Sequence, residues 1–156
     1  MSSLVMSHYE INEQTMALIP ANYTDYQTIA METDKKLYIK KTPFQIIERG
    51  CLNNFSSFEG RRNSVNYLTG FKRKAPIPIS VYRNIYAFPT HALKDWDCCW
   101  IFYHHVESVV KVKSNHSVIL LKNGTQVSID IPRLELLKQM ERTSYILFIS
   151  RDGLRS

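Results

Sequence analysis

Two adjacent pairs of residues carry the atoms needed to bind a metal ion. Cys98 and Cys99 lie close in the sequence to His104 and His105. Structural zinc sites usually take their cysteines from separated pairs, because adjacent cysteines cannot easily both reach one tetrahedral ion. If these residues lie on a strand, the two members of each pair point to opposite faces of the sheet. We therefore expect no metal ion or other cofactor here, and predict that the cysteines are buried and behave as small apolar residues.

The same residues leave a catalytic alternative open, in which Cys99 is a nucleophile paired with His104 or His105. The sequence contains no G-x-S-x-G, H-E-x-x-H, Walker or G-x-G-x-x-G motif, and its carboxylates are scattered. These motifs mark the common hydrolase, metalloprotease and nucleotide-binding sites. We therefore do not expect an enzyme. A reactive Cys99 thiol would be the sign of one.

A third set of residues is basic and points to nucleic acid. Residues 61–74 contain five Lys or Arg and no acid, whereas the whole chain has 20 Lys and Arg against 14 Asp and Glu. A local positive excess attracts polyanions, although most such runs are solvated surface. Arginine enters narrow A-tract minor grooves, and lysine binds phosphate as a mobile point charge. The candidate DNA-binding residues are Arg61, Arg62, Asn63, Lys72, Arg73 and Lys74.

The elements that must position these side chains are mostly short strands. Runs of β-branched and aromatic residues predict strands over 15–20, 26–33, 35–41, 85–90 and 100–113. The spacing of apolar residues in 44–55 favours a short helix. The glycines and prolines of 58–78 favour a loop there, or a short helix held between loops, and Pro76 and Pro78 would resist a central strand. Phe58 and Phe71 are expected to pack against the core.

The clearest local signal is a hairpin over 117–131. Asn123-Gly124 separates two strand-like runs, which predicts a type I′ turn. Pro132 suits the first turn of a helix. The predicted apolar stripe of that helix consists of Leu134, Leu137, Met140, Ser144 and Leu147. The expected fold class is α+β, a predominantly antiparallel β domain with short helices and a C-terminal helix, in a single domain over 1–156.

The cysteines and the distribution of apolar residues indicate the cellular compartment. Its three cysteines are odd in number and two are adjacent, which is typical of a reducing cytosol rather than of a disulfide framework. Residues 1–10 lack the basic and apolar regions of a signal peptide. No uncharged apolar run approaches the roughly 20 residues of a membrane span. We expect a cytoplasmic protein that does not associate with membranes.

Several short motifs in one order resemble the ComK family, the competence transcription factors of low-GC Gram-positive bacteria. They run from about Tyr9 to about Phe148. The most specific are Ser57-Phe58-Glu59-Gly60-Arg61, Lys74-Ala75-Pro76-Ile77, Phe88-Pro89-Thr90 and Cys99-Trp100-Ile101. Residues 104–137 also resemble the hairpin-then-helix of LytTR-type DNA-binding domains, over a much smaller part of the chain.

The ComK resemblance implies a DNA-binding activator of the late competence genes and of its own promoter. Members of the family bind paired A/T-rich boxes of double-stranded DNA through the minor groove, as homo-oligomers. Since that groove offers a degenerate code, selection must depend on its width and deformability.

The resemblance stops before the end of the longer family members. This chain ends at Ser156, where those members continue through a basic helical region implicated in recognition by a protease adaptor. DNA is therefore a firmer expectation as a partner than the adaptor. The alternative is a truncated protein-interaction module that pairs with a full-length regulator or adaptor without productive DNA binding.

Overall fold

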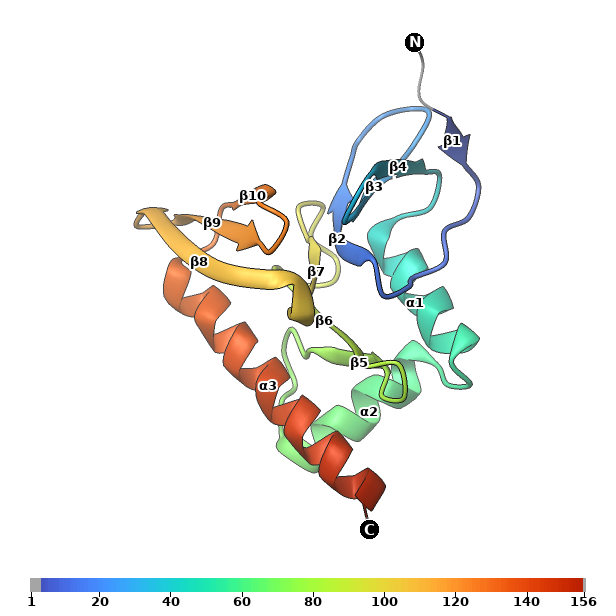
Figure 1. Ribbon diagram of the computed structural model, residues 1–156, viewed down its shortest axis with the longest axis vertical. Coiled ribbons are helices and arrows are strands. Elements are labelled where there is room, and N and C mark those ends of the chain that lie inside the picture. The colour runs from blue at the N-terminus through green and yellow to red at the C-terminus, as the bar shows by residue number, and fades with distance from the viewer. Residues whose placement is uncertain (1–3, 156) are drawn as a thin grey trace.

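The computed structural model describes residues 4–155 as two sheets and three long helices (Figure 1). The helices are α1 (Pro43–Asn53), α2 (Phe58–Thr69) and α3 (Arg133–Arg155). The strands are β1 (Val5–Met6), β2 (Thr15–Pro20), β3 (Thr28–Glu32), β4 (Lys36–Ile39), β5 (Ile77–Ser80), β6 (Ile85–Pro89), β7 (Trp100–Phe102), β8 (Val106–Lys113), β9 (His116–Leu121) and β10 (Gln126–Ile129).

The larger sheet has seven strands in the order β1-β4-β3-β2-β7-β6-β5, and the smaller has three in the order β10-β9-β8. Neighbouring strands run antiparallel, apart from the parallel pair β1 and β4. This architecture confirms the predicted α+β class. Pro78 lies in β5 at the sheet edge, where a missing backbone N–H costs no ladder bond.

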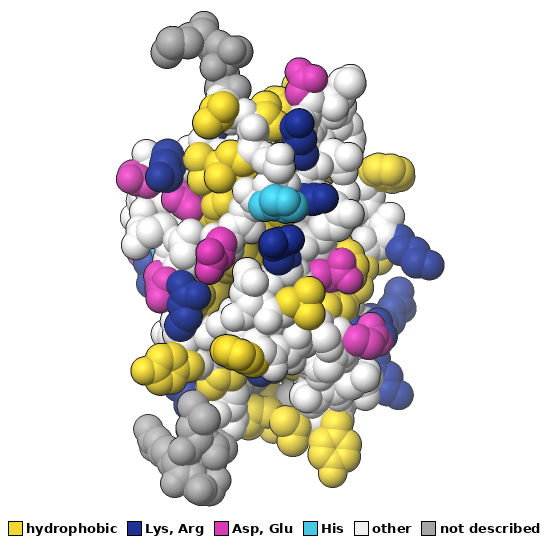
Figure 2. All heavy atoms as spheres, turned by 90° about the vertical axis from the view of Figure 1, so that its right-hand side faces the viewer, with side chains coloured by type: hydrophobic (Ala, Val, Ile, Leu, Met, Phe, Trp, Pro, Cys, Tyr) yellow, Lys and Arg dark blue, Asp and Glu magenta, His cyan; other side chains and the backbone are white. Residues whose placement is uncertain are grey.

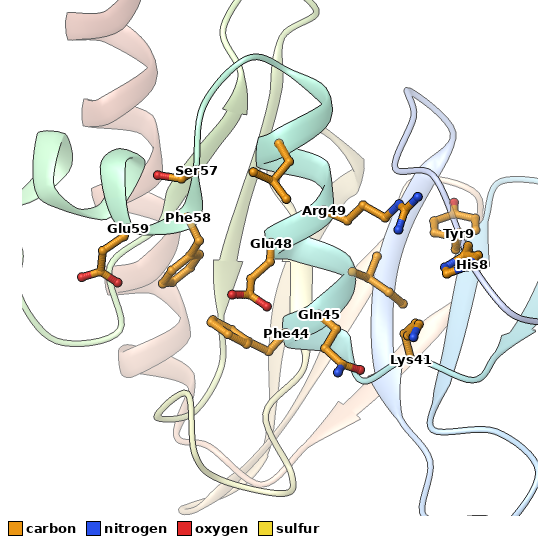
Figure 3. A pocket seen from close by; sticks show the side chains of 12 residues that line it. His8, Tyr9, Lys41, Phe44, Gln45, Glu48, Arg49, Ser57, Phe58 and Glu59 are labelled. Atoms are coloured by element: carbon orange, nitrogen blue, oxygen red, sulfur yellow. The ribbon is translucent and has the colours of Figure 1, made fainter.

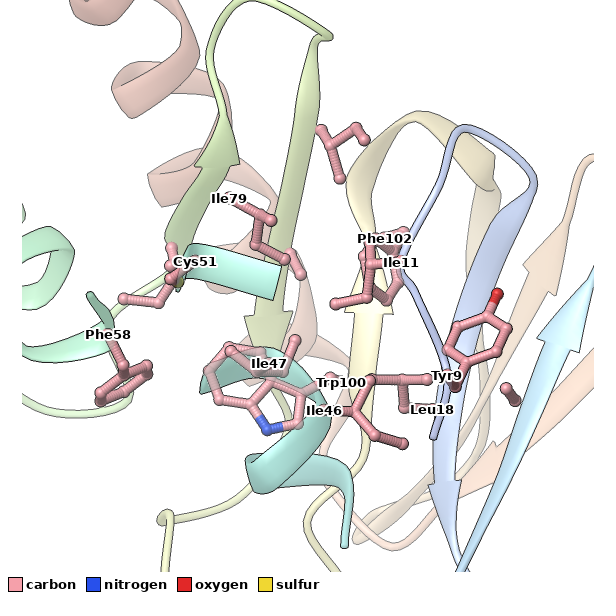
Figure 4. Packing of buried hydrophobic residues seen from close by; sticks show 14 of the residues in the cluster. Tyr9, Ile11, Leu18, Ile46, Ile47, Cys51, Phe58, Ile79, Trp100 and Phe102 are labelled. Carbon is pink, nitrogen blue, oxygen red and sulfur yellow. The ribbon is translucent and has the colours of Figure 1, made fainter. Parts of the chain in front are cut away.

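Both faces of the large sheet are buried, because successive strand residues point to opposite sides. Trp100 and Phe102 of β7 join a core cluster that α1 and α2 cover, whereas Ile101 between them joins a second cluster under the small sheet and α3. Figure 4 shows Phe58 of α2 and Ile47 of α1 packed around Trp100 in the first cluster. The helices are therefore fixed to the sheet that they flank.

The stretch after Ser57 forms a helix followed by a loop, so the short-helix alternative is confirmed. The Ser57 hydroxyl caps the start of α2 by accepting a hydrogen bond from the Gly60 amide at 2.9 Å. Gly70 ends the helix in the left-handed region at φ 79°. The chain then continues as an irregular segment, residues 70–76, which we call the basic loop.

The hairpin of β9 and β10 is confirmed, but the predicted type I′ turn is wrong. That turn needs a positive φ at both central residues, and here Gly124 has one (92°) while Asn123 does not. The Gly124 amide donates to the Leu121 carbonyl at 2.9 Å, closing a three-residue loop with a left-handed glycine at its end. The Asn123 side chain accepts from the Thr125 amide within the turn and donates to the Thr33 carbonyl of another hairpin, both at 3.0 Å.

The predicted single strand over 100–113 is divided in two. Residues Tyr103–His105 form a 3₁₀ turn between β7 and β8, where the chain leaves the large sheet for the small one. The Lys122 amide donates to the His105 carbonyl at 2.8 Å and holds this crossing in place. The assumption that the two histidines lie on a strand was therefore wrong.

The predicted apolar stripe of α3 is confirmed in part, since Leu137, Met140 and Leu147 are half-buried and pack against the core clusters. Leu134 is 76% exposed and Ser144 is also exposed, whereas the fully buried positions are Leu136, Gln139, Thr143 and Ile146. Two of these are polar and bind backbone carbonyls, so hydrophobic periodicity could not identify them. Within the described residues no helix has both the length and the apolarity to span a bilayer.

The turn between α1 and α2 carries an unusual residue. Phe55 has a φ of 60° and is fully exposed. Its amide donates to the Leu52 carbonyl at 3.2 Å and the Ser56 amide donates to the Cys51 carbonyl at 3.1 Å. This is the helix-ending pattern in which glycine normally takes the left-handed position.

Replacing Phe55 by glycine should therefore stabilise the fold. The left-handed strain is relieved and no packing is lost, so we expect the free energy of unfolding to rise by about 0.5 to 1 kcal/mol after the entropy cost of glycine. Urea denaturation followed by circular dichroism measures this change. Phe55→Ala retains a Cβ and should stay close to the parent. A glycine variant less stable than the parent would contradict the strain argument.

Candidate nucleic-acid interface

The structure divides the predicted DNA-binding residues between two elements. Arg61, Arg62 and Asn63 lie on α2, whereas Lys72, Arg73 and Lys74 lie on the basic loop. Phe58 and Val65 of α2 are buried, which fixes the rotation of the helix about its axis. The six residues consequently differ in how freely their side chains can reach a ligand.

Arg61 lies beside the buried face of α2. Its Nε atom is buried and has no hydrogen-bond partner, and its charge is close enough to Cys51 of α1 to act on that thiol. Burial raises the pKa of Cys51 to about 11, and the Arg61 charge opposes this rise. The burial of its Nε atom suits a structural side chain more than one that extends to a duplex.

Arg62 and Asn63 are more accessible. Arg62 forms an ion pair with Glu59 one turn earlier, and the two side chains are 42% and 63% exposed. Exposed pairs of this kind contribute about 0.3 to 0.5 kcal/mol, so a phosphate could replace Glu59 at small cost. Asn63 is exposed on the outer side of the helix.

The basic loop presents two of its three bases to solvent. Lys72 and Arg73 are exposed. Lys74 is half-buried with a φ of 52°, and its Nζ donates to the Thr90 carbonyl at 3.4 Å. Lys72 and Arg73 are therefore the bases of the predicted run that are freest to contact a ligand.

Helix α3 contacts the basic loop through the side chains of two residues that the sequence analysis did not identify as candidates. Gln139 Nε2 donates to the Lys74 carbonyl at 2.8 Å and to the Pro89 carbonyl at 2.9 Å. Arg142 Nη1 donates to the Arg73 carbonyl at 3.0 Å, and its guanidinium lies 4.5 Å from the centre of the Phe71 ring. Phe71 packs against the Tyr145 ring and the buried cluster that contains Val65 and Ile146, as expected of a packing aromatic.

The same part of α3 adds positive charge to the surface. Lys138 is exposed one turn before Arg142, and both line a shallow groove with Phe71, Glu141 and Tyr145. The basic surface is thus composite, with contributions from the loop and from α3. By contrast, the face in Figure 2 intersperses Lys and Arg with Asp and Glu.

The cysteines and histidines that the sequence analysis considered as a metal or catalytic site are Cys98, Cys99, His104 and His105. Cys98 and Cys99 are buried, as predicted, and burial raises the pKa of Cys99 to about 12, which keeps the thiol protonated at neutral pH. His105 Nε2 donates to the Glu13 carbonyl at 2.9 Å, and burial lowers the pKa of His104. Across residues 4–151, whose side chains are described, no three metal-binding side chains come together.

A hollow of about 360 Å³ lies beside α1. Figure 3 shows that Phe44 and Glu48 point to one side of the helix, whereas Arg49 points to the other side, toward Tyr9 and His8. The titratable groups of this hollow are therefore divided by the helix and do not converge on one point. The arrangement is unlike a general acid–base pair, which must reach a common atom.

Comparison with known proteins agrees with the motif resemblance. The family model described as ComK protein matches residues 6–155. The competence transcription factor of Bacillus subtilis (strain 168) is 26% identical over 142 residues, which are 90% of this chain and 74% of that protein. No solved structure matches the chain significantly. Since the family match spans nearly every residue from the first strand to the end of α3, this chain belongs to the ComK family.

Proposed function

We propose that this protein regulates the transcription of competence genes by binding double-stranded DNA at A/T-rich sites. The family and the name of its Bacillus subtilis relative support the regulatory role. The observation that carries the DNA-binding part is the exposed pair Lys72 and Arg73 on a loop that α3 holds in place.

The chemistry of these side chains suits a minor groove. An arginine on a protruding loop can enter a narrow A/T-rich groove, where the negative potential is enhanced. The neighbouring bases Arg62 and Lys138 would contact phosphates and Asn63 would supply a hydrogen bond, which fixes the position of the protein on the duplex. We assign Arg61 and Lys74 a supporting role, because the Nε atom of Arg61 is buried and the Nζ atom of Lys74 donates to the Thr90 carbonyl.

A DNA site with two A/T-rich boxes is best matched by two protomers, one for each box. Two half-sites one helical turn apart are matched by two copies of the same surface, so we propose that the protein binds as a homo-oligomer. Recognition then depends on the shape of each box and on the spacing between the boxes.

Replacing A·T pairs by inosine·cytosine pairs tests the groove directly. Such pairs keep the minor-groove surface of A·T, since inosine lacks the N2 amino group of guanine, but present a G·C-like major groove. We expect the protein to bind the inosine duplex nearly as well as the A/T duplex and to bind the G·C duplex weakly. Loss of binding to the inosine duplex would instead place recognition in the major groove.

A further inference from the structure

The basic loop contains two residues in the left-handed region of backbone geometry. Gly70 begins it at a φ of 79° and Lys74 has a φ of 52°. Residues other than glycine populate this left-handed region only when surrounding contacts hold them there. The residues that contact Lys74 are therefore the candidates for the groups that hold it in this conformation.

The buried amide of Gln139 supplies the first of these contacts. Gln139 is 2% exposed and uses its Nε2 atom to bind the carbonyls of Lys74 and Pro89. Its Oε1 atom accepts from Arg142 Nη1 at 2.8 Å. Both ends of the amide are thus satisfied, and Gln139 ties Lys74 of the basic loop to Pro89, the last residue of β6.

Arg142 supplies the second contact. Its guanidinium faces the Phe71 ring while Nη1 donates to the Arg73 carbonyl. A planar guanidinium can stack on a ring and donate within its own plane at once, which an ammonium group cannot reproduce. The carbonyls of Arg73 and Lys74 are therefore both bound on the α3 side, and the exposed side chains of Lys72 and Arg73 project from a loop of fixed shape.

We propose that Gln139 and Arg142 are positioning residues that fix the shape of the basic loop, and that this shape sets the preference of the protein for A/T-rich DNA over other sequences. The inference rests on the proposed function. A positioning role has a different consequence from a direct DNA contact. A fixed spacing of side chains is needed to distinguish groove widths, whereas non-specific phosphate binding requires only the charge.

Arg142→Lys is the sharpest test, because it keeps the charge and removes the planar group. We expect it to bind the A/T duplex about five- to tenfold more weakly while binding a G·C duplex as the parent does, with an unchanged dependence on salt. The matched control is Lys138→Gln on the same helix. It should weaken binding to both duplexes alike and reduce the slope of log K against log salt by about one.

Hydrogen exchange of residues 71–75 in the free protein gives a readout independent of DNA. The Arg142→Lys variant should exchange faster in this segment than the parent and Lys138→Gln. Unchanged exchange, or an unchanged ratio of A/T to G·C affinity, would overturn the positioning role. Equal losses on both duplexes would make Arg142 a direct, non-selective contact of the DNA backbone instead. A parent protein without any A/T preference would defeat the proposed function itself, which distinguishes the two failures.

Discussion

Replacing Lys72 and Arg73 together by glutamine should weaken binding to an A/T-rich duplex by about 30-fold, corresponding to about 1 kcal/mol for each lost contact. Both side chains are exposed on the basic loop, and neither is needed to hold the fold. The slope of log K against log salt should also become shallower by about two, since each phosphate contact displaces a counterion.

The experiment requires a control for net charge, because removing any two positive charges weakens attraction to a polyanion. Lys111 and Lys113 are exposed on β8 of the small sheet. The double variant Lys111→Gln/Lys113→Gln removes the same charge and should change affinity by less than about threefold. Fluorescence anisotropy with one labelled duplex measures both variants.

The opposite pattern would relocate the interface. If the β8 variant lost binding and the loop variant kept it, the DNA would contact the three-stranded sheet. Circular dichroism of both variants should match the parent, since all four side chains are solvated.

Replacing Trp100 by alanine should lower the free energy of unfolding by about 4 kcal/mol, which is within the range for large aromatic residues removed from a core. Trp100 is 1% exposed on β7, between β2 and β6 in the large sheet. Its ring packs edge-to-face with Phe58 of α2, with 6.3 Å between ring centres. The variant therefore loosens α2 as well as the sheet.

Trp96 is the natural control, because it has the same side chain in the loop before β7 and is 79% exposed. Trp96→Ala should change the free energy of unfolding by no more than about 0.5 kcal/mol, as is usual for surface substitutions. Urea titrations followed by far-ultraviolet circular dichroism compare the two variants without relying on tryptophan fluorescence. Similar costs for both would contradict the assignment of the core.

The fold class was predictable because its signals are local. Asn123-Gly124 marks the hairpin and Pro132 marks the approach to α3, whatever lies elsewhere in the chain. The exact turn was not predicted, and part of what holds it is a bond from Asn123 to a carbonyl of a distant hairpin. The break at Tyr103–His105 was missed for a similar reason, because it reflects a change of sheet rather than a change of composition.

The candidate interface was predictable only as a region. A count of charges treats the five basic residues as equivalent, whereas in the fold they differ in how exposed their side chains are. The helical caps Ser57 and Gly70 were present in the sequence, and a helix between them places Arg61 beside Phe58 and Val65 on the inner side. No local signal could have identified Gln139 and Arg142, whose loop partners lie 65 and 69 residues away.

The most direct test of the central claim is the affinity of the protein for two duplexes across a salt series. One duplex carries two A/T-rich boxes one helical turn apart, and the other has the same length and is G·C-rich. With Arg62, Lys72, Arg73 and Lys138 at the phosphates or in the groove, we predict a preference of at least tenfold for the A/T duplex and a slope of about −3 to −4 per protomer. Weak and equal binding to both duplexes would contradict the account and favour a protein-interaction module.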